Sequence, residues 1–143
     1  MPLCIAVAAD HGGFDLKTLL LPELSALGFA VLDLGACDRE PVDYPDFADA
    51  LAAALETGRA DSGLLVCGSG IGMSIAVNRH AAIRGALCHD ALTARLARQH
   101  NDANVLVLGG RILGPELARD CLKIFLTTAF EGGRHARRVA QLA

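Results

Sequence analysis

Cys67 stands directly before a glycine-rich segment, Gly68-Ser69-Gly70-Ile71-Gly72, which follows an apolar run and precedes a stretch of helical period. Glycines let backbone N–H groups approach a ligand closely, and the start of a helix adds positive potential. A thiol beside such groups has its thiolate stabilised, so Cys67 is a candidate base or nucleophile. The segment could equally be a tight turn, with Cys67 a buried and inert thiol.

The spacing of the loop excludes two familiar nucleotide sites. Met73 stands where a dinucleotide-binding loop has its last glycine, and the Gly-Lys-Ser/Thr of a P-loop is absent. The loop on its own therefore predicts an oxyanion site only weakly.

Other polar side chains occur in small groups. Asp10 and His11 precede a glycine pair, and His100 and Asn101 end a helical stretch. Each group could be catalytic, or could satisfy local backbone groups or cap a helix. His80 and His89 have no supporting motif, and we expect them to be structural.

Arg134 and Arg138 are four residues apart, so on a helix both guanidinium groups can point the same way and grip a phosphate. The alternative is that the two arginines form a basic helix face that is exposed to solvent and binds no ligand. Arg111, after an apolar run, is a third candidate.

Short apolar runs that alternate with helical segments must position these groups. This alternation predicts an α/β fold, a Rossmann-like doubly wound sheet of five parallel strands flanked by helices. The expected strands are Leu3–Ala9, Ala30–Leu34, Gly63–Cys67, Ile83–Leu87 and Asn104–Leu108.

Helices are expected between these strands. Pro22 should kink or restart the first helix, the next should cover Phe47–Leu55, and another should follow Gly72. Asp90 is a plausible cap for a helix that reaches His100. Gly114-Pro115 should begin a fifth helix, and a short C-terminal helix should carry the basic tail.

Because such sheets bind ligands at the carboxyl ends of their strands, we expect the three clusters to converge there. These clusters are the residues around Asp10, the loop that follows Cys67, and the region of His100, Asn101 and Arg111.

Composition narrows the functional classes. A length of 143 residues fits a single domain, 1–143, and a net charge of −3 argues against a general nucleic-acid surface. No apolar run is long enough to cross a bilayer, and the amino terminus does not read as a secretory signal. Five cysteines without CxxC pairing make disulfides and structural metal improbable. We expect a cytoplasmic protein without membrane partners.

Five ordered motifs resemble the ribose-5-phosphate isomerase type B family, which includes allose and galactose phosphate isomerases. They are AADHGGFDLK at 8–17, DYPDFA at 43–48, CGSGIGMSIAVNR at 67–79, RQHNDANVLVLGGR at 98–111 and FEGGRHARRV at 130–139. The resemblance covers essentially the whole chain. It implies an isomerase of phosphorylated sugars that uses no cofactor or metal.

The resemblance also implies roles. Met73 stands where one branch of the family has a glutamate base, so Cys67 places this chain in the cysteine branch. Ser69 would move a proton between substrate oxygens, and His100 with Asp10 would open the sugar ring. The remaining substrate-binding residues would be His11, Tyr44, Gly68, Gly70, Ile71, Gly72, Asn101, Arg111, Arg134 and Arg138.

The family further implies a homo-oligomer, dimer or tetramer, with active sites at the subunit interface. Asp10, His11 and the Cys67 loop of one subunit would then face a neighbour's residues, namely His100, Asn101, Arg111 and the tail arginines. Ribose 5-phosphate is the expected substrate. Allose, galactose or tetrose phosphates, a phosphate- or nucleotide-binding module without chemistry, and a redox thiol remain alternatives.

Overall fold

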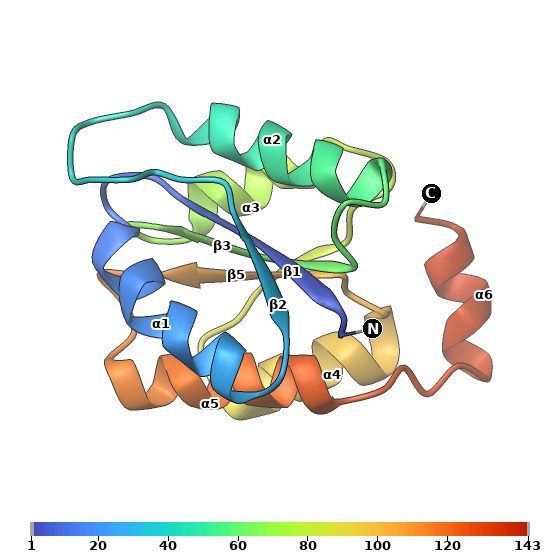
Figure 1. The fold of residues 1–143 in the computed structure, drawn as a ribbon. Helices are drawn as coiled ribbons and strands as arrows, with labels where there is room; N and C mark the ends of the chain where they lie inside the picture. Colours follow the sequence, from blue (N-terminus) through green and yellow to red (C-terminus); the bar gives the residue numbers. More distant parts are fainter. Residues whose placement is uncertain (1, 143) are drawn as a thin grey trace.

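The computed structural model describes residues 2–142, which form five strands and six helices (Figure 1). The strands are β1 (Cys4–Ala9), β2 (Ala30–Asp33), β3 (Ser62–Cys67), β4 (Gly85–Leu87) and β5 (Val105–Gly109). They pair in parallel in the order β2-β1-β3-β5-β4. The predicted doubly wound parallel sheet is confirmed.

The sheet forms because its central strands are short apolar runs that are buried on both faces. All residues of β5 are buried, as are five of the six in β1 and in β3. Side chains alternate between the faces, so Leu64 and Val66 pack into one apolar cluster and Leu65 and Cys67 into the other. The functional thiol candidate therefore sits on the face covered by α2 and α3.

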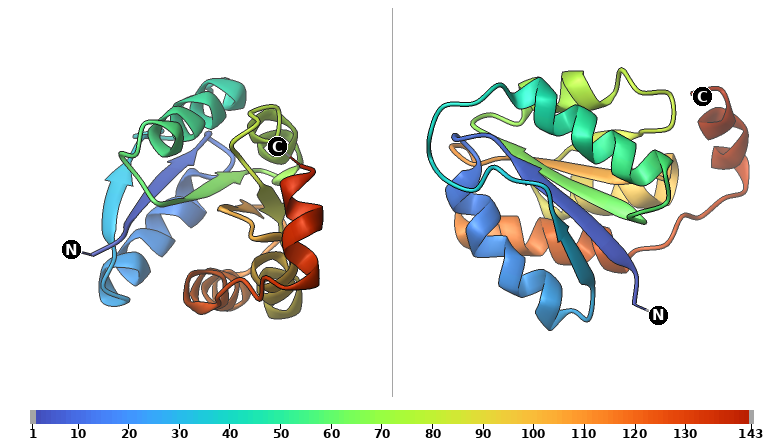
Figure 2. Two further views of the ribbon diagram at one scale, coloured as in Figure 1. Left: turned by 90° about the vertical axis from the view of Figure 1, so that its right-hand side faces the viewer. Right: turned by 45° about the horizontal axis from the view of Figure 1, so that its top comes forward.

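Helices cover both faces of the sheet. α2 (Tyr44–Glu56) and α3 (Ile71–Val77) lie on one face, and α1 (Phe14–Ala26), α4 (Ala91–Asn101) and α5 (Pro115–Thr127) lie on the other (Figure 1). α6 (Arg134–Ala140) stands apart and approaches α4, as the turned views make clear (Figure 2).

Two helices bear on the expectations. Pro22 was expected to kink or restart the first helix, and of these two outcomes the restart does not occur, since α1 continues across Pro22. Proline removes only one hydrogen bond, and the buried side chains of Leu20 and Leu24 on either side hold the helix in place. α2 begins at Tyr44, three residues earlier than predicted, because Pro45 occupies its first turn, where no N–H donor is needed. The start of α4 is as predicted, with Asp90 accepting the Thr93 N–H at 2.7 Å.

The chain order defines two functional edges of the sheet. From β1 the chain passes to β2 on one side and then to β3 on the other side of β1. The loops that follow β1 and β3 therefore leave in opposite directions and open a crevice at the carboxyl edge of the sheet. The helices return the chain to the amino edge, where α4 ends. None of the helices in the described part of the chain is long and apolar enough to span a bilayer.

Candidate active site

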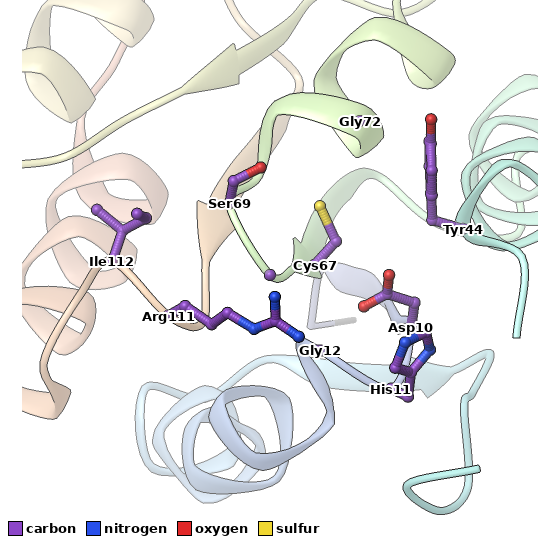
Figure 3. Close-up of a pocket in the computed structure, with 10 residues that line it drawn as sticks. Asp10, His11, Gly12, Tyr44, Cys67, Ser69, Gly72, Arg111 and Ile112 are labelled. Carbon is purple, nitrogen blue, oxygen red and sulfur yellow. The ribbon is translucent and has the colours of Figure 1, made fainter. Parts of the chain in front are cut away.

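Cys67 ends β3 at this crevice and is 4% exposed. The Gly70 N–H donates to its Sγ at 3.2 Å, so the sulfur is held as a hydrogen-bond acceptor at the start of α3. The donor can reach back because Gly70 adopts a left-handed conformation with φ +80°, which disfavours any side chain. The sulfur points into the crevice, between Ser69 and Tyr44 (Figure 3).

The N–H groups of the loop are already partly used. Ile71 N–H donates to Ser69 Oγ at 3.2 Å, while Gly70 N–H serves the thiol. Ser69 thus accepts a bond at its oxygen and keeps its own proton available. Two N–H groups of the loop therefore bind the Cys67 sulfur and the Ser69 hydroxyl oxygen.

A cavity of about 330 Å³ opens in front of the sulfur. It is lined by residues that follow β1, β3 and β5 together with the start of α2, namely Asp10, His11, Gly12, Tyr44, Cys67, Gly68, Ser69, Gly72, Arg111 and Ile112. Eight of these residues are predicted site residues, while Gly12 and Ile112 were missed. The topology therefore brings two of the three clusters together.

Asp10 and His11 follow β1 and are held in fixed orientations. Asp10 is 7% exposed, and its Oδ1 accepts the Gly13 N–H at 3.1 Å. The Val42 N–H donates to His11 Nδ1 at 3.2 Å. In the neutral imidazole the proton must then lie on Nε2, which makes that nitrogen a hydrogen-bond donor.

Arg111 lies in the loop after β5 and lines the cavity of Cys67 in the same chain. This differs from the expectation that a neighbouring subunit supplies Arg111. Its N–H donates to the Gly68 carbonyl at 2.9 Å, and its side chain runs within van der Waals distance of Gly68. The reason is that β5 ends beside β3, since Cys67 and Gly109 are register partners. Arg111 therefore places a positive charge in the same cavity as the thiol (Figure 3).

Tyr44 packs its ring over the first turn of α3. A Cβ added to Gly72 would lie 2.7 Å from Tyr44 Cζ, so only glycine leaves room for the ring there. Tyr44 remains 39% exposed and forms one wall of the cavity.

His100 and Asn101 do not join this cavity, and the predicted convergence is wrong for them. They end a helix rather than a strand, and a helix between parallel strands ends at the amino edge. The neighbouring Asn104 carbonyl accepts the Gly63 N–H at 2.9 Å, at the beginning of β3. His100 and Cys67 thus lie at opposite edges of the sheet.

A second cavity, of about 310 Å³, gathers the polar groups of that edge. It is lined by His100, Asn101, His135, Arg138, Val139 and Leu142. Arg134 and Arg138 share α6 as predicted, but Arg134 does not line this cavity. One chain therefore carries two separate cavities that are lined by predicted site residues.

Glu131 and His135 are residues of this edge that the sequence reasoning missed. Glu131 Oε1 lies 3.8 Å from His100 Nε2 and 3.6 Å from His135 Nε2. Their i, i+4 spacing within the FEGGRHARRV motif was a usable signal. The three side chains could ligate a metal ion, but the neighbouring guanidinium groups of Arg134 and Arg138 oppose a cation.

The other cysteines are not placed for chemistry, as predicted. All five are free in the described chain. Burial raises the pKa of Cys88 and of Cys121 to about 11, so both are thiols at neutral pH. Cys37 is exposed and lines neither cavity.

Comparisons with known proteins agree with this architecture. The family model described as Ribose/Galactose Isomerase matches residues 5–142. Ribose-5-phosphate isomerase B of Escherichia coli strain K12 is 44% identical over 135 residues, covering 94% of this chain and 91% of the relative. D-erythrulose-4-phosphate isomerase of Pectobacterium atrosepticum is 41% identical over 142 residues, covering 98% and 93%.

A solved structure is also similar to this chain. The ribose 5-phosphate isomerase of Thermotoga maritima superposes with a TM-score of 0.95 at 48% identity, covering 98% of this chain and 97% of that one. The superposition therefore covers nearly all of the chain, including the segments that line both cavities.

Proposed function

The chain belongs to the ribose/galactose isomerase family, and from that membership we propose that it converts ribose 5-phosphate to ribulose 5-phosphate. It is an aldose-ketose isomerase of phosphorylated sugars. The observation that carries the choice of base is the Gly70 N–H bond to the Cys67 sulfur, at the wall of a cavity that also contains a cation, Arg111.

In the proposed reaction the Cys67 thiolate removes the proton from carbon 2 of the open-chain aldose. The electron pair forms the carbon–carbon double bond of a cis-enediolate, with negative charge on oxygen 1. Ser69, whose oxygen accepts a bond from Ile71 and whose proton is free, passes the proton of oxygen 2 to oxygen 1. The Cys67 thiol then returns its proton to carbon 1, and a ketose results.

The enediolate needs hydrogen-bond donors where its charge develops. We assign this role to the N–H groups of Gly70 to Gly72, and removing one donor of this kind commonly costs about 100-fold to 1,000-fold in rate. Gly70 and Ile71 already serve the thiol and Ser69. Their donors can turn to the substrate oxygen as the sulfur takes up the proton and loses its charge.

The phosphate is assigned to the cationic and donor groups. His11 would donate from Nε2, and Arg111 supplies a guanidinium with no carboxylate partner among residues 2–142. Arg134 and Arg138 would complete the clamp. Binding energy from the phosphate would position the reacting carbons at the sulfur.

A second copy of the chain must supply the remaining groups. His100, Asn101 and Arg138 line a cavity at the other edge of the sheet, out of reach of Cys67 in the same chain. A homodimer in which each amino edge faces its partner's carboxyl edge would form two identical sites. In each site, His100 of one copy and Asp10 of the other would open the sugar ring.

Proton transfers between carbon and oxygen lie within the chemistry of these side chains, so the proposed steps use no metal or organic cofactor. We place the reaction in the cytoplasm, since a phosphorylated sugar does not cross a bilayer unaided.

The test is direct. Purified protein incubated with ribose 5-phosphate should form ribulose 5-phosphate, and kcat/KM should exceed the values for allose 6-phosphate, galactose 6-phosphate and D-erythrose 4-phosphate. A higher kcat/KM for the tetrose phosphate would assign the substrate of the Pectobacterium relative instead. Phosphate binding without turnover of any sugar phosphate would instead support the alternative of a non-catalytic phosphate-binding module.

A further inference from the structure

The carboxylate of Glu131 faces two imidazole rings that stack on each other. The centroids of His100 and His135 are 4.3 Å apart, and their planes differ by 16°. Glu131 Oε1 lies 3.8 Å from Nε2 of the first ring and 3.6 Å from Nε2 of the second. The Glu131 carboxylate therefore faces the Nε2 edge of both imidazole rings.

The segment that carries Glu131 is tied to the last turn of α4. The Glu131 N–H donates to the Gln99 carbonyl at 3.0 Å, one residue before His100. Three residues upstream of Glu131, the Thr128 carbonyl accepts from Arg98 Nε at 3.2 Å. The backbone of Glu131 is therefore fixed relative to His100, and its carboxylate has a defined place.

The two histidine side chains differ in their exposure to solvent. The His135 side chain is only 10% exposed, whereas that of His100 is 36% exposed. Burial lowers the pKa of His135, and the nearby His100 and Arg134 lower it further, so this ring is mainly neutral at pH 7. His135 is thus a buried, mainly uncharged platform on which the more exposed His100 ring stacks.

The charges around His100 make Glu131 significant. Arg134 and Arg138 on α6 and Arg98 on α4 are positive, and Asp102, the residue that caps the end of α4, is already paired with Arg98 at 2.9 Å. The carboxylate within 4 Å of His100 among residues 2–142 is that of Glu131. Without it, no carboxylate among residues 2–142 would lie within 4 Å of the His100 ring to hold its orientation.

We propose that Glu131 is a positioning residue of the isomerase, whose carboxylate together with the His135 platform holds the His100 ring in the orientation needed to open the sugar. This proposal rests on the ring-opening role that the proposed function gives to His100. Glu131 itself does not touch the substrate.

The proposal separates substrates by their need for ring opening. Ribose 5-phosphate closes into a furanose, whereas D-erythrose 4-phosphate cannot, because its oxygen 4 carries the phosphate. Misplacing a catalytic group by about 1 Å can cost on the order of 100-fold. Glu131→Gln should therefore lower kcat for ribose 5-phosphate by about 10-fold to 100-fold, with KM within about twofold and the tetrose phosphate rate nearly unchanged.

Two further variants sharpen the kinetic test. Glu131→Asp keeps the charge and should recover part of the lost kcat. Glu116→Gln, a matched control that removes an exposed carboxylate from the first turn of α5, should behave as wild type. Equal losses with both substrates in Glu131→Gln, or no loss with either, would overturn the proposal.

A measurement on the free protein is independent of turnover. Stacking should shift the His100 ring-proton resonances upfield through the ring current of His135, and Glu131→Gln should remove most of this shift. An unchanged shift would overturn the positioning role even if the protein is an isomerase. A lost shift in a protein that turns over no sugar phosphate would instead support the positioning and refute the proposed function. Circular dichroism of each variant excludes unfolding as the cause.

Discussion

Cys67 and His100 lie at opposite edges of one parallel sheet. Cys67 is the register partner of Gly109 at the carboxyl end of β5, whereas His100 ends α4 near Asn104, which bonds to Gly63 at the beginning of β3. The step of four residues from Gly63 to Cys67 corresponds to roughly 13 Å of extended chain. A site that uses both groups must combine two copies of the chain.

Mixed dimers test this arrangement. Cys67→Ser and His100→Asn chains, co-expressed with different tags and purified through both, should show about half the wild-type activity, because one of the two sites in each dimer is intact. Each parent variant alone should be nearly inactive. Heterodimers as inactive as their parents would place both groups in the site of a single copy, and an active parent variant would remove its residue from the site.

Cys67→Ser should abolish turnover and leave the fold intact. A hydroxyl is a far weaker acid than a thiol, and loss of a general base commonly costs about 100-fold to 10,000-fold in kcat. The variant is measured by steady-state assay and circular dichroism, with the exposed Cys37→Ser as control. Full activity in Cys67→Ser would eliminate the proposed base.

His100→Asn should slow ribose 5-phosphate much more than D-erythrose 4-phosphate. Only the pentose phosphate must be opened from a furanose ring before carbon 2 can lose its proton. The comparison requires kcat for both substrates with the same preparation. Equal losses with the two substrates would remove the ring-opening role from His100.

Arg138→Ala should chiefly weaken substrate binding. A hydrogen bond between a guanidinium and a phosphate contributes about 1.5–3 kcal/mol, so KM should rise roughly 10-fold to 100-fold. Arg137→Ala is the matched control, since Arg137 lies on the same helix but does not line the His100 cavity. An unchanged KM and phosphate affinity in Arg138→Ala would count against the clamp.

Gly13→Ala should destabilise the protein by about 1–3 kcal/mol, the usual cost of overpacking. A Cβ at Gly13 would overlap the Val66 carbonyl one residue before Cys67, so α1 could no longer approach β3 closely. Gly114→Ala, where a Cβ meets no atom within 4 Å, should change stability by less than about 0.5 kcal/mol. Urea unfolding of the two variants provides the comparison.

The sequence was sufficient for the fold class and for the place of Cys67 at the carboxyl end of a strand, before the glycine-rich loop. Alternating strand and helix patterns depend on local spacing, and the position of a loop after a strand follows from chain order alone. The strand limits were correct to within two residues, since β4 begins at Gly85 rather than Ile83. The thiol, Ser69, Asp10 and His11 therefore came together as predicted.

Tertiary structure alone decided which edge each remaining group occupies. Arg111 joins Cys67 because β5 lies beside β3, and strand order is not written in local spacing. His100 falls at the far edge because α4 runs antiparallel to the strands it connects, and Glu131 reaches it because the segment after α5 folds back onto Gln99. Such contacts depend on residues distant in the chain, whose approach is set by the packing of whole helices.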